Sequence, residues 1–258
     1  MRVASRKNVY IGCAGWSLPS ASRPHFGAGD SMLARYATRF NAVEINSSFH
    51  RPHRRDTYAR WAASVPTDFR FSVKLPRAIT HDARLRGTAP GLDRFAAEVD
   101  GLGRKLAVLL VQLPPSLTFE ARIAATFFAM LRRRFETGIA CEARHASWFA
   151  PAADALWERY GIARVAADPP VPHGASCDPA GDARVRYWRW HGSPRVYYSA
   201  YDDAALHALA GAMRAGRGTR WAIFDNTAHG HAVTDAARLQ MMVDDAPNGA
   251  LTMQRRKA

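Results

Sequence analysis

The chain alternates short apolar runs with longer segments in which apolar residues recur every three or four positions. Eight short runs, rich in apolar or β-branched residues, cover residues 9–15, 41–46, 70–75, 107–113, 137–143, 163–168, 184–192 and 219–226. Runs of this kind predict buried strands of a parallel sheet. Their alternation with helical patterns is typical of repeated βα units.

Apolar stripes with helical spacing lie between most of these runs. The stripes begin at Leu33, Leu92, Ile123, Leu206 and Ala232. A further helix is predicted from Pro151, with Gly161 just past its end, which matches the preference for proline at helix starts and glycine after helix ends. The segment PPVPHGASCDPAGDA after the sixth run is too rich in proline and glycine for a helix and predicts a long loop.

This order of elements predicts an α/β protein, a single TIM-type (β/α)8 barrel in which an irregular loop replaces the helix after strand six. The chain has 258 residues and 48% hydrophobic residues, enough for one large core. We expect residues 1–258 to form one domain, with residues 246–258 as a loose C-terminal tail. The irregular loop would leave the top of a barrel strand, where it either covers an active site or serves only as a connection.

Side chains alternate between the two faces of a strand, so the bulky apolar positions indicate which residues point into the barrel. In residues 41–46, Val43 and Ile45 face the helices, which leaves Glu44 and Asn46 inward. The last two strands are ambiguous, because tryptophans or phenylalanine compete with polar residues for the same face. For these two strands we assign Arg189, His191 and Asn226 to the inward face. The other inward polar residues are Lys74, Gln112, Glu142, Arg144 and Asp168.

These polar residues lie near the carboxyl ends of their strands. Earlier inward positions are small or apolar, namely Gly12, Ala14, Ala42, Val108, Ala140 and Ala166. Enzymes with this fold build their active sites at the carboxyl ends of the strands. The polar residues are therefore the candidate site.

Seven segments carry a specific resemblance and run in order along nearly the whole chain. They are GCAGWS (12–17), VEINSSFHR (43–51), FSVKLPRAITH (71–81), LLVQLPPS (109–116), CEARHASWF (141–149), WRWHG (188–192) and FDNTAHGHA (224–232). Together they resemble the YecE-like family, domain of unknown function 72. The resemblance implies a TIM barrel, in agreement with the strand count, and brings no established reaction.

The fold of this family is similar to that of metal-dependent barrels that cut abasic DNA, which by analogy implies a nucleic-acid role. The first motif departs from the family pattern, since Cys13 and Ala14 stand where small hydroxyl residues are usual. Leu18 stands where an aromatic residue often follows. Neither change removes a candidate charged group.

The formal net charge of +14 also raises the question of a polyanionic partner. Its basic residues are spread along the chain and are mostly arginine; the lysines are Lys7, Lys74, Lys105 and Lys257. Net charge alone speaks to non-specific association. The sequence contains neither a membrane-spanning run nor a signal-like start, so we expect a cytoplasmic protein. Its three cysteines, Cys13, Cys141 and Cys177, form no C-x-x-C motif, which indicates neither disulfides nor a thiolate zinc site.

The charges expected to converge are balanced: Glu44, Glu142 and Asp168 face Lys74, Arg144 and Arg189. A site for several metal ions needs an excess of carboxylates and imidazoles, so we predict no metal. Cations at one pocket suit a phosphate or carboxylate.

Our hypothesis is a metal-independent acid-base enzyme, a hydrolase, lyase or isomerase, that acts on an anionic small molecule. Glu44 or Glu142 would be the general acid or base, and His191 would carry a proton. The substrate would be bound by the cations, with Asn46, Gln112 and Asn226 orienting it and Trp16 either walling the pocket or packing in the core.

Three alternatives stay open. The protein could bind nucleic acid or cleave phosphodiesters with a metal, or bind a ligand without turnover. The charged residues could also form a self-neutralised network that only holds the strand ends together. The sequence indicates no cofactor and no oligomeric state.

Overall fold

The computed structural model describes residues 8–244, so the predicted tail at 246–258 lies outside the described residues. The strands are β1 (Val9–Cys13), β2 (Ala42–Ile45), β3 (Arg70–Lys74), β4 (Leu106–Gln112), β5 (Gly138–Glu142), β6 (Ile162–Arg164), β7 (Ala166–Asp168), β8 (Ala180–Gly181), β9 (Val185–Trp190) and β10 (Thr219–Phe224).

The α-helices are α1 (Met32–Tyr36), α2 (Arg55–Ala63), α3 (Ala89–Val99), α4 (Ala121–Arg134), α5 (Pro151–Tyr160), α6 (Asp203–Ala215) and α7 (His231–Asp244). Short 3-10 or π turns are η1 (Ser20–His25), η2 (Ser47–Phe49), η3 (Ala78–Asp82), η4 (Asp100–Lys105) and η5 (Ala146–Phe149).

The strands form two sheets, in the order β1-β10-β9-β7 and β2-β3-β4-β5-β6-β8. All neighbours are parallel except β6 and β8. β6 and β7 are two halves of the predicted strand at 163–168. Val165 lies between them, and its N–H donates to the carbonyl of Cys141 at 2.9 Å. The two sheets therefore meet at this strand.

The sheets also meet where β1 runs beside β2, and here side chains take the place of a regular ladder. The Asn41 side chain accepts from Ile11 N–H (3.1 Å) and donates to the carbonyl of Val9 (2.7 Å). The Tyr36 hydroxyl accepts from Cys13 N–H (2.8 Å) and donates to the carbonyl of Ala42 (3.0 Å). Backbone groups that would otherwise be left without partners are thus satisfied.

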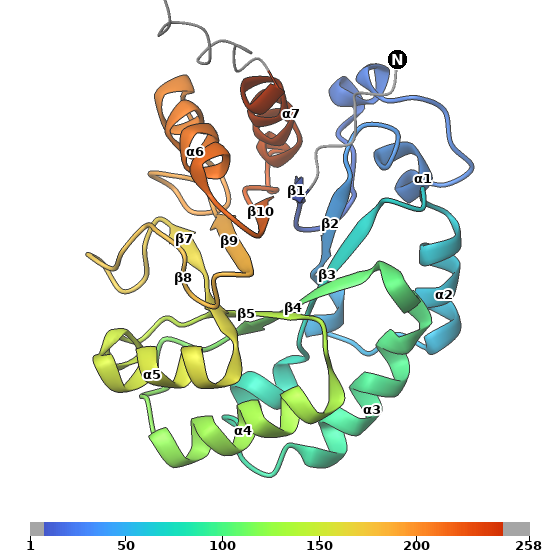
Figure 1. The fold of residues 1–258 in the computed structure, drawn as a ribbon. Coiled ribbons are helices and arrows are strands. Elements are labelled where there is room, and N and C mark those ends of the chain that lie inside the picture. The colour runs from blue at the N-terminus through green and yellow to red at the C-terminus, as the bar shows by residue number, and fades with distance from the viewer. Residues whose placement is uncertain (1–7, 245–258) are drawn as a thin grey trace, which may run out of the picture.

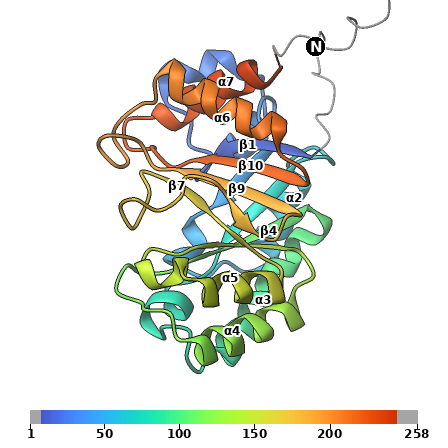
Figure 2. The same ribbon diagram turned by 60° about the vertical axis from the view of Figure 1, so that its left-hand side comes forward.

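Apolar side chains pack in two separate clusters. The larger lies between the strands and the helices, which surround the strands on their outer side (Figures 1 and 2). The smaller contains Ala42, Val108, Leu110, Ala140, Ala163, Val165, Val185, Tyr187, Trp221 and Ile223, contributed by strands of both sheets. Because strand residues alternate faces, the two clusters identify which side chains point inward.

The mixed α/β fold with parallel sheets is confirmed. No helix lies between β7 and β9 in the described residues, as predicted for this loop, which contains the two-residue strand β8. Helix α2 was not predicted, because Tyr58 is its one fully buried residue and its exposed face is polar. Within residues 8–244, no helix has the length and apolar character needed to cross a membrane.

Candidate functional site

Arg189 on β9 lies at the centre of a buried charged cluster. Its side chain is fully buried, and Nη2 lies 2.8 Å from Oε1 of Glu44 and 3.0 Å from Oδ2 of Asp225. Nη1 lies 3.2 Å from Oε2 of Glu142. One guanidinium thus joins carboxylates from β2, from β5 and from the residue after β10. We call Glu44, Glu142, Arg144, Arg189, His191 and Asp225 the strand-end cluster.

Glu44 is held from two sides. Arg189 donates through Nε as well as Nη2, and the hydroxyl of Tyr187 donates to Oε2 at 2.9 Å. The same hydroxyl lies 2.9 Å from Oγ of Ser72. Burial and the Glu44 charge raise the pKa of Tyr187 well above its usual value, so the hydroxyl keeps its proton and remains a donor.

Glu142 receives the largest number of donors in the cluster. Arg144 donates to Oε1 through Nε at 2.7 Å, and the side chain of Gln112 donates to the same oxygen at 3.1 Å. Burial alone would raise the pKa of Glu142, but Arg144, Arg189 and His191 together hold it well below its usual value. Glu142 is therefore ionised at neutral pH.

His191 lies between two carboxylates. Its Nδ1 is 3.1 Å from Oδ2 of Asp225, and its Nε2 is 3.3 Å from Oε1 of Glu142. Burial lowers the pKa of His191, but Glu142 and the hydrogen bonds with both carboxylates outweigh it and raise the pKa above its usual value. The ring can therefore carry a proton near neutral pH.

Lys74, at the end of β3, is only 6% exposed. Its Nζ lies 4.1 Å from the ring centre of Phe49, and no hydrogen bond or ion pair to Nζ forms within residues 8–244. Burial, followed by the charge of Arg189, lowers the pKa of Lys74 to about 8; Glu44, Glu142 and Asp225 oppose this shift.

His81, in η3, borders the same region. Its ring packs edge-on against Phe49 at 4.9 Å, and its Nδ1 lies 2.9 Å from the hydroxyl of Thr80. Burial and then the charges of Lys74, Arg77 and Arg144 lower the pKa of His81 to about 4. The ring is therefore neutral at pH 7.

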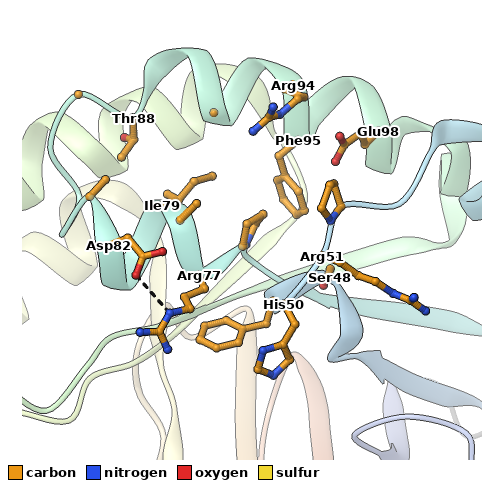
Figure 3. A pocket seen from close by; sticks show the side chains of 17 residues that line it. Ser48, His50, Arg51, Arg77, Ile79, Asp82, Thr88, Arg94, Phe95 and Glu98 are labelled. Atoms are coloured by element: carbon orange, nitrogen blue, oxygen red, sulfur yellow. Dashed lines mark hydrogen bonds and ion pairs between the residues drawn. The ribbon is translucent and has the colours of Figure 1, made fainter.

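A cavity of about 290 Å³ lies near this region, bordered by η2, η3 and α3 (Figure 3). Phe49 lines it, as do three arginines, Arg51, Arg77 and Arg94. No residue of the strand-end cluster lines this cavity. Phe49 thus contacts both Lys74 and the cavity.

Seven predicted site residues lie together, as the alternation of side chains along the strands indicated. They are Glu44, Lys74, Gln112, Glu142, Arg144, Arg189 and His191. The inward choice of Arg189 and His191 over the neighbouring tryptophans is also confirmed. Trp188 belongs to the outer apolar cluster, and Trp190 packs against it.

The predicted inward direction was wrong for Asp168 and Asn226. Asp168 accepts from the hydroxyl of Tyr201 at 2.8 Å, and Tyr201 belongs to the outer cluster. Asn226 donates to Asp235 of α7 at 2.8 Å. In both strands the prediction turned the bulky apolar residues, Val165 and Ile223, toward the helices. The structure places them in the smaller apolar cluster, which also contains large residues, so side-chain size did not distinguish the two faces.

Two other predicted residues lie apart from the cluster's hydrogen bonds. The Trp16 ring packs edge-on against Trp61 of α2 at 5.0 Å, which places it against the outer layer. Asn46 precedes η2, and its buried Oδ1 has no hydrogen-bond partner among the described residues. These contacts therefore do not support a role for Trp16 or Asn46 in lining the strand-end cluster.

Strand alternation missed Asp225 and Tyr187, and it cannot place His81. Asp225 follows from the alternation Trp221, Ile223, Asp225 once the first two are known to face inward. Tyr187 was passed over as an apolar position, although its hydroxyl reaches Glu44. His81 lies in a turn beyond β3, where strand alternation does not apply. Within residues 8–244, no three His, Cys, Asp or Glu side chains are grouped so that they could hold a metal ion.

The fold and site define an α/β protein with parallel sheets and a buried charged cluster at the strand ends. The chain belongs to the family described as protein of unknown function DUF72, whose model matches residues 10–258. It is 32% identical over 145 residues to UPF0759 protein YecE of Escherichia coli K12, over 55% of this chain and 50% of that protein. The match with UPF0759 protein YunF of Bacillus subtilis is 27% over 151 residues, over 55% of this chain and 53% of that protein.

These alignments cover about half the length of the curated relatives. Solved structures match over more of the chain. A DUF72 family protein from Thermotoga maritima has a TM-score of 0.76 at 23% identity, covering 92% of this chain and 99% of that chain. One from Enterococcus faecalis has a TM-score of 0.75 at 19% identity, covering 93% and 97%. At these identities the likeness concerns the fold.

Proposed function

We propose that the main strands form one TIM-type barrel, with β6 and β7 together counting as its sixth strand. Two observations support this. Side chains of Tyr36 and Asn41 complete the hydrogen bonding between β1 and β2, and Val165 joins the sheets on the other side. The smaller apolar cluster draws residues from strands of both sheets, as the interior of a barrel does.

We further propose that the protein is an acid-base enzyme that acts, without a metal, on a small molecule carrying a phosphate or carboxylate. The observation that carries this proposal is the ammonium of Lys74 beside the strand-end cluster. The three carboxylates of Glu44, Glu142 and Asp225 are already balanced by Arg144, Arg189 and a protonated His191. Lys74 is only 6% exposed, and none of the described residues neutralises its ammonium, although Nζ itself keeps some contact with solvent. An anion would supply the missing counter-charge.

Arg144 would hold the anionic group together with Lys74. Its Nε and Nη2 bind Glu142, whereas its Nη1 has no hydrogen-bond partner among residues 8–244, and its side chain is 20% exposed. His191, with its raised pKa, would move the proton. Glu142 stays ionised and would orient that imidazole, which makes it a positioning residue. Glu44, saturated by Arg189 and Tyr187, would hold the guanidinium in place.

The test measures binding of inorganic phosphate and of oxalate to the purified protein by calorimetry. Lys74→Met and Arg144→Met keep most of the side-chain volume and remove the charge. Hydrogen bonds to charged groups are worth about 1.5–3 kcal/mol, so each variant should bind roughly 10-fold to 100-fold more weakly. Arg55→Met, in an exposed ion pair with Asp100, serves as the matched control and should bind like the parent protein. Absence of saturable binding of either anion to the parent protein would overturn the proposal.

A second candidate function is nucleic-acid binding, favoured by an exposed aromatic segment after β9. Tyr197 and Tyr198 are 41% and 39% exposed, and the Arg195 guanidinium lies 4.2 Å from the Tyr198 ring centre. Bases stack on such side chains. In a fluorescence titration with a single-stranded oligonucleotide, the double variant Tyr197→Ala, Tyr198→Ala should bind more weakly than the parent protein. Equal affinity of the two proteins would exclude this segment as the binding surface.

A further inference from the structure

We infer that Lys74 is an amine nucleophile, and that the substrate presents an aldehyde or ketone carbon to it beside its anionic group. The inference rests on the proposed anion site for the identity of the substrate, and on the surroundings of Lys74 for the reaction. The amine stands at the carboxyl end of β3, with Phe49 against it and no polar partner among residues 8–244. The product of its attack would be an imine.

Lys105 provides a contrast, because its ammonium is hydrogen-bonded and has a structural role. Nζ of Lys105 donates to the carbonyls of Ala62 at 2.6 Å and Val65 at 2.7 Å, which ties η4 to the end of α2. Lys74 is the more deeply buried of the two, yet its Nζ makes no such bond within residues 8–244. Because Nζ also keeps some contact with solvent, a ligand can reach this amine at the end of β3.

The electrostatics favour an amine that loses its proton easily. Burial and Arg189 lower the pKa of Lys74 to about 8, so roughly a tenth of the amine is unprotonated at pH 7. The three carboxylates of the cluster lie beyond ion-pair distance of Nζ and only partly oppose this shift. Lysines activated by an apolar neighbour or a nearby cation are the ones that form covalent bonds with carbonyl compounds.

The chemistry balances without an oxidant or a reductant. The unprotonated Nζ attacks the carbonyl carbon, one amine hydrogen passes to the carbonyl oxygen, and a carbinolamine forms. The C–O bond then breaks as the second amine hydrogen joins that oxygen, which leaves as water and gives the C=N bond. Arg144 would hold the anionic group of the same substrate during both steps. This assigns the substrate to oxo acids or phosphorylated carbonyl compounds.

The test traps the imine with cyanoborohydride, which converts it to a stable secondary amine on the lysine. Glyoxylate, which carries both an aldehyde and a carboxylate, is the probe, and acetaldehyde is its uncharged counterpart. The four lysines can be separated by peptide mapping with mass spectrometry. Lys105 and the α-amino group are internal references, the second because its ordinary pKa is also near 8.

We expect glyoxylate to label Lys74 at least tenfold faster than Lys105 or the α-amino group. Lys74→Arg keeps a positive charge at this position but cannot form an imine, so it should lose this labelling. Labelling of Lys74 no faster than that of the references would overturn the inference. So would label that maps to another residue.

Two further arms separate this inference from the proposed function. If glyoxylate labels Lys74 no faster than acetaldehyde, and phosphate gives no protection, the amine is a nucleophile and the anion site is refuted. If phosphate binds saturably and Arg144→Met weakens it, but neither aldehyde labels Lys74, the anion site stands and the nucleophile is refuted.

Discussion

Replacement of Arg189 by methionine tests whether the strand-end cluster holds the fold together. The variant leaves Glu44, Glu142 and Asp225 buried without the guanidinium that joins them at 2.8–3.2 Å. Removing one partner of a buried ion pair costs about 3–5 kcal/mol, because the remaining charge is not compensated. For a chain of this size that corresponds to a fall in Tm of roughly 6–20 °C.

The assay is urea unfolding followed by tryptophan fluorescence, with a parallel thermal melt, at pH 7.5 and at pH 5. Burial raises the pKa of Asp225, whereas Arg189 and His191 lower it below its usual value. A carboxyl with a lowered folded-state pKa contributes stability above its unfolded pKa and loses it as the pH falls through the folded value. Without Arg189 the folded-state pKa rises, so protonation relieves the variant first.

The deficit of Arg189→Met should therefore be smaller at pH 5 than at pH 7.5. Arg55→Met is the control, because Arg55 and Asp100 are 60% and 65% exposed, and it should change stability by less than about 1 kcal/mol. A deficit of Arg189→Met below about 1 kcal/mol, or one that grows on acidification, would refute this account of the cluster.

Three further variants test other parts of the structure by urea unfolding. Tyr36→Phe removes the hydroxyl between Cys13 N–H and the neighbouring strand, and should cost about 1–3 kcal/mol because a buried donor is left unpaired; an unchanged midpoint would contradict this. Asn226→Ala breaks the bond to Asp235 and should reduce stability by roughly 1–2 kcal/mol while phosphate affinity stays the same; weakened binding would return Asn226 to the site. Lys74 has a lowered folded-state pKa, so the parent protein should gain roughly 1–3 kcal/mol of stability relative to Lys74→Met as the pH rises from 7 to 10; no relative gain would show that its ammonium is not desolvated.

The strand and helix pattern and much of the site could be predicted because both depend on local periodicity. All eight predicted strands correspond to observed ones, with the sixth divided at Val165. The alternation of side chains placed Glu44, Glu142 and Arg189 on one face, and in the structure both carboxylates lie within 3.2 Å of the Arg189 guanidinium. Residues that are two positions apart on a strand lie on the same face of the sheet, and this does not depend on the rest of the chain.

The tertiary structure decided what periodicity leaves open, which is the choice of face where both faces are buried. At 163–168 the one large apolar residue, Val165, packs in the smaller cluster, and at 219–226 large apolar residues lie on both sides, because the smaller cluster is as apolar as the layer beneath the helices. Asp168 and Asn226 were assigned to the wrong side for that reason, and Asp225 was missed. Alternation could not place His81, because a turn has no alternation to follow.

The sequence by itself determined the order of strands and helices, the end of the strands where charge collects, and the identity of most charged residues there. Only the tertiary structure decided how those charges pair. Three carboxylates pair with Arg189, Arg144 and His191, and the Nζ of Lys74 is left without a polar partner among residues 8–244. The physical reason is that pairing depends on distances of 3–4 Å between strands far apart in the chain, and a count of charges carries no distances.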